Sequence, residues 1–170
     1  MSDSTDVTAW LSGRLPEEWF EGAPSVSVDR EEIVVVGRLA VPELEEGADE
    51  SAARRAEAGR ISRFREQTRG ARMRVADEAE QSFDRKVAWG ARCGETVTLF
   101  TSLATPVMTR LRQPQRQVLD TLVEAGVARS RSEALAWCVR LVGQHQQDWI
   151  GELRDALSAV ERARATGPAA

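Results

Sequence analysis

The feature that most constrains the fold is residues 104–142, which read as one short strand followed by two helices. Along residues 107–112 the side chains alternate between a face with apolar character and a largely basic face. A period of two residues predicts a strand that is covered on one side only. The residues on the uncovered face are Met108, Arg110 and Arg112.

Two helices are expected after this strand. Polar residues 113–117 place the start of the first helix near Pro114, a residue that a first helical turn tolerates. Apolar residues then recur at helical spacing until Gly126, which favours the end of a helix. Ser130 precedes a second apolar stripe and has Glu133 three residues later, a spacing typical of a capping box.

A lone strand of this length is not stable in water, so it needs a partner. Antiparallel pairing with the same strand of a second copy, about a two-fold axis, provides one. The sequence therefore predicts an obligate homodimer formed through residues 106–112.

The order of these elements resembles the ribbon-helix-helix family of DNA-binding proteins over about residues 104–143. The resemblance rests on the Met-Thr-Arg-Leu strand and on the Gly-Val-Ala-Arg-Ser-Arg-Ser-Glu-Ala-Leu turn into the second helix. It implies that paired strands enter the major groove and read base edges through Met108, Arg110 and Arg112. It also implies that the start of the second helix contacts a DNA phosphate. The residues at those positions are Arg129, Ser130, Arg131 and Ser132.

A second interpretation of residues 104–142 remains open. The strand and the two helices would then belong to another kind of core, and Arg110 and Arg112 would be the charges that edge strands often carry. A serine that caps a helix is common and does not by itself indicate a phosphate site.

The distribution of charge matters more for DNA binding than the net charge of −4. The first 50 residues hold thirteen acidic side chains and three arginines, whereas basic residues outnumber acidic ones in the rest of the chain. An acidic N-terminal part is compatible with a basic face elsewhere. The sequence has neither a signal-peptide pattern nor an apolar run of transmembrane length, so a cytoplasmic protein with no membrane partner is expected.

The N-terminal part predicts two β-hairpins on either side of a long helix. Residues 25–41 and 86–103 have the alternation and turn residues of hairpins. Residues 51–83 have helical periodicity, and residues 7–20 resemble short helical turns. These elements predict an antiparallel sheet with a helix on one face.

The fold class expected for the whole chain is α+β. An N-terminal domain of residues 1–103, built from antiparallel hairpins and a long helix, is followed by a ribbon-helix-helix-like unit at residues 104–164. The last helix of that unit is an amphipathic segment, residues 146–164.

Two local expectations concern the N-terminal domain. Gly90 and Gly94 place the turn of the second hairpin between them, so Cys93 is expected in that turn and exposed. The long helix has interleaved arginines and acids, which favours a solvated face. The arginines in question are Arg60, Arg63, Arg65, Arg69, Arg72 and Arg74.

No residue pattern indicates catalysis, a metal or a cofactor. The sequence has one histidine and two widely separated cysteines, which argues against a zinc site. No nucleophile motif or phosphate-binding loop accompanies the acidic residues, so no enzyme is expected. The function predicted is that of a homodimeric, sequence-specific DNA-binding protein, a bacterial transcriptional regulator. The alternative is a protein-interaction or scaffolding module that uses the same dimer without DNA. The N-terminal domain would bind a protein or a ligand.

Overall fold

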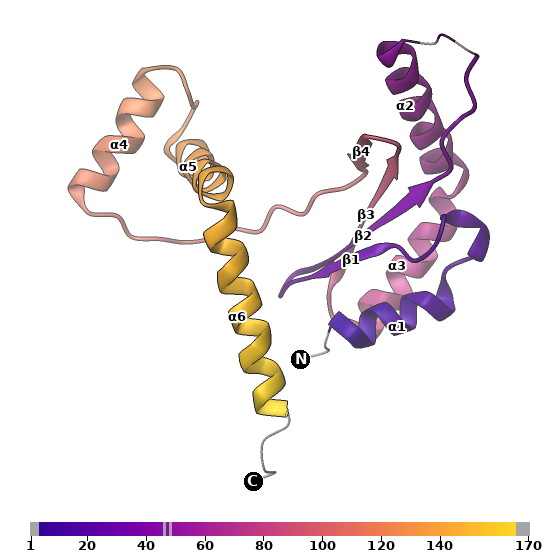
Figure 1. Ribbon diagram of the computed structural model, residues 1–170. Helices are drawn as coiled ribbons and strands as arrows, with labels where there is room; N and C mark the ends of the chain where they lie inside the picture. The colour runs from indigo at the N-terminus through magenta and orange to yellow at the C-terminus, as the bar shows by residue number, and fades with distance from the viewer. Residues whose placement is uncertain (1–3, 46, 48, 166–170) are drawn as a thin grey trace. The chain divides into compact units, whose positions relative to one another are not determined.

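The computed structural model describes residues 4–45, 47 and 49–165, and it divides the chain into two compact units. The first unit ends at Pro106 and the second begins at Val107. The first holds a four-stranded sheet with three α-helices, and the second holds an extended segment and three further helices (Figure 1). The predicted α+β fold class is confirmed. The boundary in the structure lies three residues after the one expected from the sequence, so residues 104–106 belong to the first unit.

The sheet contains the strands β1 (Ser25–Val28), β2 (Glu32–Leu39), β3 (Lys86–Cys93) and β4 (Thr96–Leu99), in that spatial order. Both predicted hairpins are present, because β1 pairs antiparallel with β2 and β3 pairs antiparallel with β4. The prediction of a fully antiparallel sheet is wrong, because β2 and β3 are parallel. The physical reason lies in the connection: a long helical crossover allows the second of two adjacent strands to run in the same direction as the first.

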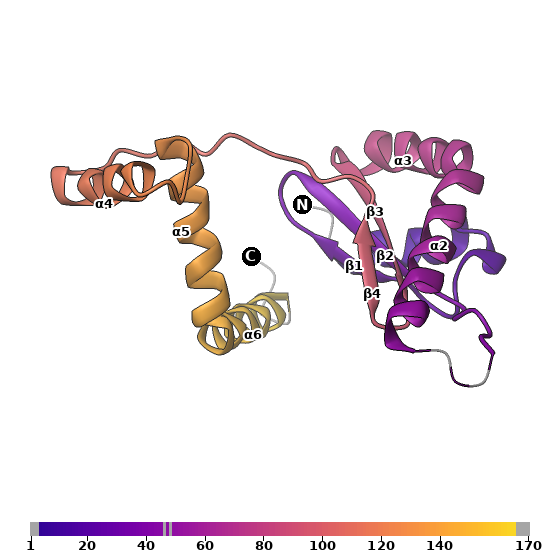
Figure 2. The ribbon, with the colours of Figure 1, turned by 90° about the horizontal axis from the view of Figure 1, so that it is seen from above.

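That crossover consists of two helices, α2 (Glu50–Gln67) and α3 (Arg69–Phe83), and not of the one long helix that was predicted. The helices meet at Thr68, whose hydroxyl donates a hydrogen bond to the Phe64 carbonyl oxygen at 2.6 Å. Side-chain bonds of this kind compete with the helical ladder. With α1 (Ser4–Arg14), which is followed by a 3₁₀ turn at Glu17–Trp19, both helices cover the same face of the sheet (Figure 2).

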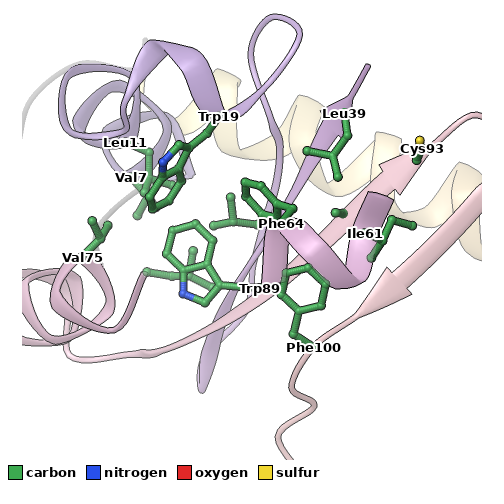
Figure 3. Close-up of a cluster of buried hydrophobic side chains, with 13 residues drawn as sticks. Val7, Leu11, Trp19, Leu39, Ile61, Phe64, Val75, Trp89, Cys93 and Phe100 are labelled. Atoms are coloured by element: carbon green, nitrogen blue, oxygen red, sulfur yellow. The ribbon is translucent and has the colours of Figure 1, made fainter. Parts of the chain in front are cut away.

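The core of the first unit lies between that face and the helices (Figure 3). Trp19 contacts both Phe64 and Trp89 edge to face, with ring centroids 5.9 and 6.1 Å apart. Such aromatic pairs stabilise a core beyond the area that they bury. Strands β2 and β3 contribute alternate residues to this core. The period-two pattern in the sequence therefore marks the face of the sheet that the helices cover.

Cys93 belongs to this core, and the prediction of an exposed cysteine in a turn is wrong. It is the last residue of β3 and its exposed fraction is 0%. Burial raises the pKa of its thiol, which disfavours the reactive thiolate. The turn lies one residue later, at Gly94 and Glu95, where Gly94 has a φ of +54° that suits glycine. Gly90 is not in a turn either, because it pairs with Leu99 inside the sheet.

A buried carboxylate fixes this hairpin to α2. Glu57 accepts hydrogen bonds from the backbone amide of Thr96 at 3.2 Å and from its hydroxyl at 2.5 Å. A Cβ atom on Gly94 would lie 2.0 Å from a carboxylate oxygen of Glu57. The glycine is therefore required by its backbone angle and by its neighbour.

The second unit has α4 (Gln113–Glu124), α5 (Arg131–His145) and α6 (Gln147–Ala165). The predicted helix start near Pro114 and helix end before Gly126 are confirmed. Among the described residues of this unit, Leu119, Ala128 and Ala134 form a small buried cluster, with a few half-buried neighbours around them. Residues 107–112 do not form the predicted strand in this single chain. A strand needs a partner for its backbone groups, and the described part of the chain provides none for this segment.

Candidate nucleic-acid interface

The residues predicted to read bases lie in the extended segment before α4. Met108 is 100% exposed, and Arg110 and Arg112 are exposed as well. Leu111, in contrast, packs against the buried cluster of the second unit. The segment therefore directs Leu111 inward and leaves the three predicted reading residues in solvent, but Val107 and Thr109, which the alternating pattern places on the covered face, are exposed as well.

Two hydrogen bonds attach the end of this segment to α4. The amide of Arg112 donates to Oε1 of Gln115 at 2.8 Å, and Nη1 of Arg116 donates to the carbonyl oxygen of Leu111 at 2.7 Å. The other end is uncovered, because the Val107 side chain is 87% exposed. The polar run before the apolar stripe of α4 thus anchors the extended segment.

The turn between α4 and α5 builds the predicted start of the second helix. Gly126 has a φ of +75°, and the amide of Val127 returns to the carbonyl oxygen of Leu122 at 3.0 Å. The Ser130 hydroxyl then accepts from the amide of Glu133 at 3.2 Å, so the predicted cap is confirmed. The reciprocal bond of this cap reaches one residue further back, from the amide of Arg129 to Glu133 at 2.8 Å.

All four residues predicted to contact phosphate lie at this helix start and are exposed; they are Arg129, Ser130, Arg131 and Ser132. The Ser130 hydroxyl accepts a hydrogen bond from the amide of Glu133, and its carbonyl oxygen accepts one from the amide of Ala134. The first amides of a helix have no partner within the helix, so they are available to an anion.

Each of the two arginines at this helix start has an acidic neighbour. Arg131 donates to Asp120 of α4, and Arg129 donates to Glu133. The hydrogen bond from Arg131 lowers the pKa of Asp120, and that from the Arg129 amide is the main cause of the lowered pKa of Glu133. These acids reduce the positive potential that a phosphate would meet.

The sequence did not indicate Asp120 as part of this region. Its pairing depends on how the turn orients α4 toward α5, and no spacing rule reports that orientation. The burial of Arg72 was also missed, because its position among evenly distributed arginines suggested a solvated face.

Two further kinds of site concern metal ions and membranes. Within residues 4–45, 47 and 49–165, no group of three or more His, Cys, Asp or Glu side chains is placed to hold a metal ion. In the same ranges, no helix has both the length and the apolar character needed to cross a membrane.

Each of the two units matches a known protein family. Residues 5–99 match a family described as "Rv1265-like protein, N-terminal domain", and residues 112–164 match the "Mb1296 C-terminal domain". Neither description mentions nucleic acid. No solved structure gives a significant match.

Among curated proteins, the chain is similar to "Uncharacterized protein Mb1296" of Mycobacterium bovis and to "Uncharacterized protein Rv1265" of Mycobacterium tuberculosis. Each is 58% identical over 166 residues, which cover 98% of this chain and 72% of the relative. The chain therefore belongs to the family of Rv1265-like proteins.

Proposed function

We propose that this protein is a homodimeric, sequence-specific DNA-binding protein that regulates transcription in the cytoplasm. Two copies of residues 107–112 would pair as an antiparallel ribbon and enter the major groove, which admits a two-stranded ribbon. The starts of the two α5 helices would contact backbone phosphates. One observation carries the proposal: residues 107–110 and Arg112 are solvent-exposed in an extended segment directly before two helices with a capped turn.

The apolar surface of the second unit supports the dimer. Its buried cluster is small, and many large apolar side chains are exposed in the single chain. A unit of this size rarely leaves so much apolar surface in water without a partner. The exposed residues include Val107, Val118, Val139, Val142, Trp149, Leu153 and Leu157.

The alternative is a protein-interaction module that forms the same dimer without DNA. The ion pairs Arg131–Asp120 and Arg129–Glu133 favour it, because they neutralise cations at the helix start. The acidic N-terminal segment favours it for the same reason.

Two measurements on the full chain test the proposal. Sedimentation equilibrium should give twice the chain mass of 18.7 kDa. Fluorescence anisotropy with tiled genomic fragments should identify fragments bound well above a scrambled duplex. A monomer would contradict the dimer and the ribbon together. A dimer that binds no fragment would contradict DNA binding and support the interaction module.

A further inference from the structure

The first unit contains a pocket that the proposed function does not use. It has a volume of about 330 Å³ and lies where α2 ends, α3 begins and the sheet edge approaches. Three guanidinium-bearing residues line it together with apolar side chains of the strands and of the segment after β4. These residues are Arg65, Arg69 and Arg72, with Val87, Trp89 and Phe100. We call it the arginine pocket.

Arg72 is the buried member, with an exposed fraction of 6%. Its Nε donates to the Thr68 hydroxyl at 2.9 Å, and its Nη2 donates to the Arg65 carbonyl oxygen at 2.7 Å. Its guanidinium carbon lies 4.8 Å from the centroid of the Phe100 ring. Because a guanidinium has five N–H groups, these two bonds leave donors for a further partner.

The charge of this cluster is not balanced by a neighbouring acid. Within the described residues, none of the ion pairs includes Arg65, Arg69 or Arg72. Burial lowers the pKa of Arg72, and the charges of Arg65 and Arg69 lower it further. Like charges held together at a partly buried position favour an anion that neutralises them.

Trp89 is a further unusual member of the pocket lining. Its side chain lines the pocket and is 4% exposed, yet its indole Nε1 has no hydrogen-bond partner among the described residues. Figure 3 shows this nitrogen on the side of the ring turned away from Trp19 and Phe64. A buried donor without an acceptor is unfavourable, so an acceptor oxygen beside it would stabilise the structure.

We propose that the arginine pocket binds a small organic anion with a flat apolar body. The carboxylate or phosphate of this ligand lies among the three guanidinium groups. Its apolar body lies against Val87 and Phe100. The combination of convergent polar donors with an apolar lining is characteristic of small-molecule sites. The N-terminal unit is therefore a ligand-binding unit.

Isothermal titration calorimetry on the full chain tests this assignment with four probes. Two of them, 2-naphthoate and 2-naphthyl phosphate, carry the anionic groups. The other two are the neutral analogue 2-naphthamide and inorganic phosphate, which lacks the apolar body. At least one naphthyl anion should bind saturably, one per chain, and at least tenfold more tightly than the amide and than phosphate. Whichever anion binds more tightly identifies the head group.

Two variants locate the ligand. Arg69→Ala should weaken binding of the naphthyl anion about tenfold, or about 1.4 kcal/mol, because it removes a charged hydrogen-bond donor from the pocket. Arg74→Ala removes the same charge from the exposed surface of the same helix, outside the pocket, and should change affinity less than twofold. Trp89→Phe identifies one of the five tryptophan indole signals in a ¹⁵N spectrum, and that signal should shift when the anion binds.

Either of two kinds of result would overturn the proposal. One is that neither naphthyl anion binds saturably. The other is that the amide binds equally well, or that Arg69→Ala and Arg74→Ala have equal effects, which would indicate a non-specific apolar surface.

Discussion

Arg131 at the start of α5 donates to both carboxylate oxygens of Asp120 on α4, at 2.6 and 2.8 Å. This bidentate pair connects the two helices across their turn. Under the proposed function, a DNA phosphate at this helix start would compete with Asp120 for the guanidinium. The pair therefore adjusts how strongly the second unit would hold a nucleic-acid backbone.

Removing that competitor should strengthen DNA binding. Asp120→Asn should raise affinity for all duplexes alike and steepen the salt dependence, by roughly one unit for each further phosphate that the protein neutralises. Arg131→Ala should have the opposite effect. Fluorescence anisotropy across a salt series measures both. Glu124→Gln, which removes an acid from the exposed end of the same helix, is the control for net charge. Equal effects of Asp120→Asn and Glu124→Gln would show that Asp120 has no special position.

Arg110 should act on sequence preference instead of on overall affinity. Arg110→Ala should cost about 1–3 kcal/mol on a specific site and reduce the difference between specific and scrambled duplexes. Arg154→Ala on the exposed surface of α6 is the matched loss of charge. Competition anisotropy with both duplexes separates the two effects. If Arg110→Ala weakened both duplexes equally, the residue would contact the backbone and not the bases.

Val107 and Leu111 distinguish the dimer from a stable monomer. Leu111 packs within its own unit, so Leu111→Asp should destabilise the fold in either case. Val107 is exposed in the single chain, so Val107→Asp harms only a structure in which a second copy covers it. We expect Val107→Asp to weaken dimerisation at least tenfold in analytical ultracentrifugation while the helical signal persists. Thr105→Asp, two residues earlier and also exposed, is the control.

Two glycines in the first unit should respond in opposite directions. Gly94→Ala should destabilise by about 1–2 kcal/mol through its backbone angle. Displacement of the Glu57 carboxylate from Thr96 should add about 1–3 kcal/mol. Gly59→Ala on α2, where nothing lies within 4 Å of the new methyl group, should stabilise by about 0.5–1 kcal/mol. Urea unfolding measures both. Similar changes in the free energy of unfolding for Gly94→Ala and Gly59→Ala would show that Gly94 and Glu57 are not coupled.

Asp29 should make the first unit sensitive to acid. Its Oδ1 accepts from the amides of Glu32 and Glu31, at 2.8 and 2.9 Å, and these bonds lower its pKa. Because the pKa is lower in the folded state, the stabilisation is present above the unfolded pKa of about 3.9 and is lost as the pH falls through the folded pKa.

Asp29→Asn should therefore reduce stability at pH 7 and make the loss of stability below about pH 4 smaller. Urea unfolding followed by tryptophan fluorescence across pH measures this profile. Asp77→Asn removes one carboxylate from the exposed surface of α3 and serves as the control for net charge. A profile that Asp29→Asn leaves unchanged would contradict the assigned role.

The elements that were predicted correctly from the sequence depend on local rules. Ser130 and Glu133 form a helix cap within a span of four residues. Gly126 adopts a positive φ, which depends on the type of that one residue. The hairpins have alternation within single strands. These features need no knowledge of distant residues.

The features that the sequence did not reveal depend on distant residues. Alternation within β2 and β3 is the same whether they pair parallel or antiparallel, so their direction was not visible. Arg72 resembles Arg69 and Arg74 in sequence, but its guanidinium lies over the Phe100 ring, which is distant in the sequence. The ribbon at residues 107–112 stays a prediction, because its proposed partner strand would belong to a second chain.

The parallel pairing of β2 with β3 also affects the order in which a nascent chain gains structure. Residues 33–36 of β2 are a run of β-branched side chains, and they leave the ribosome well before β3 is synthesised. Until residues 87–90 have also left the ribosome, this run has only β1 beside it, and its other edge is open to any strand nearby. Helices α2 and α3 can form during this interval from local contacts. A ribosome that stalls between the two strands would therefore present an aggregation-prone edge.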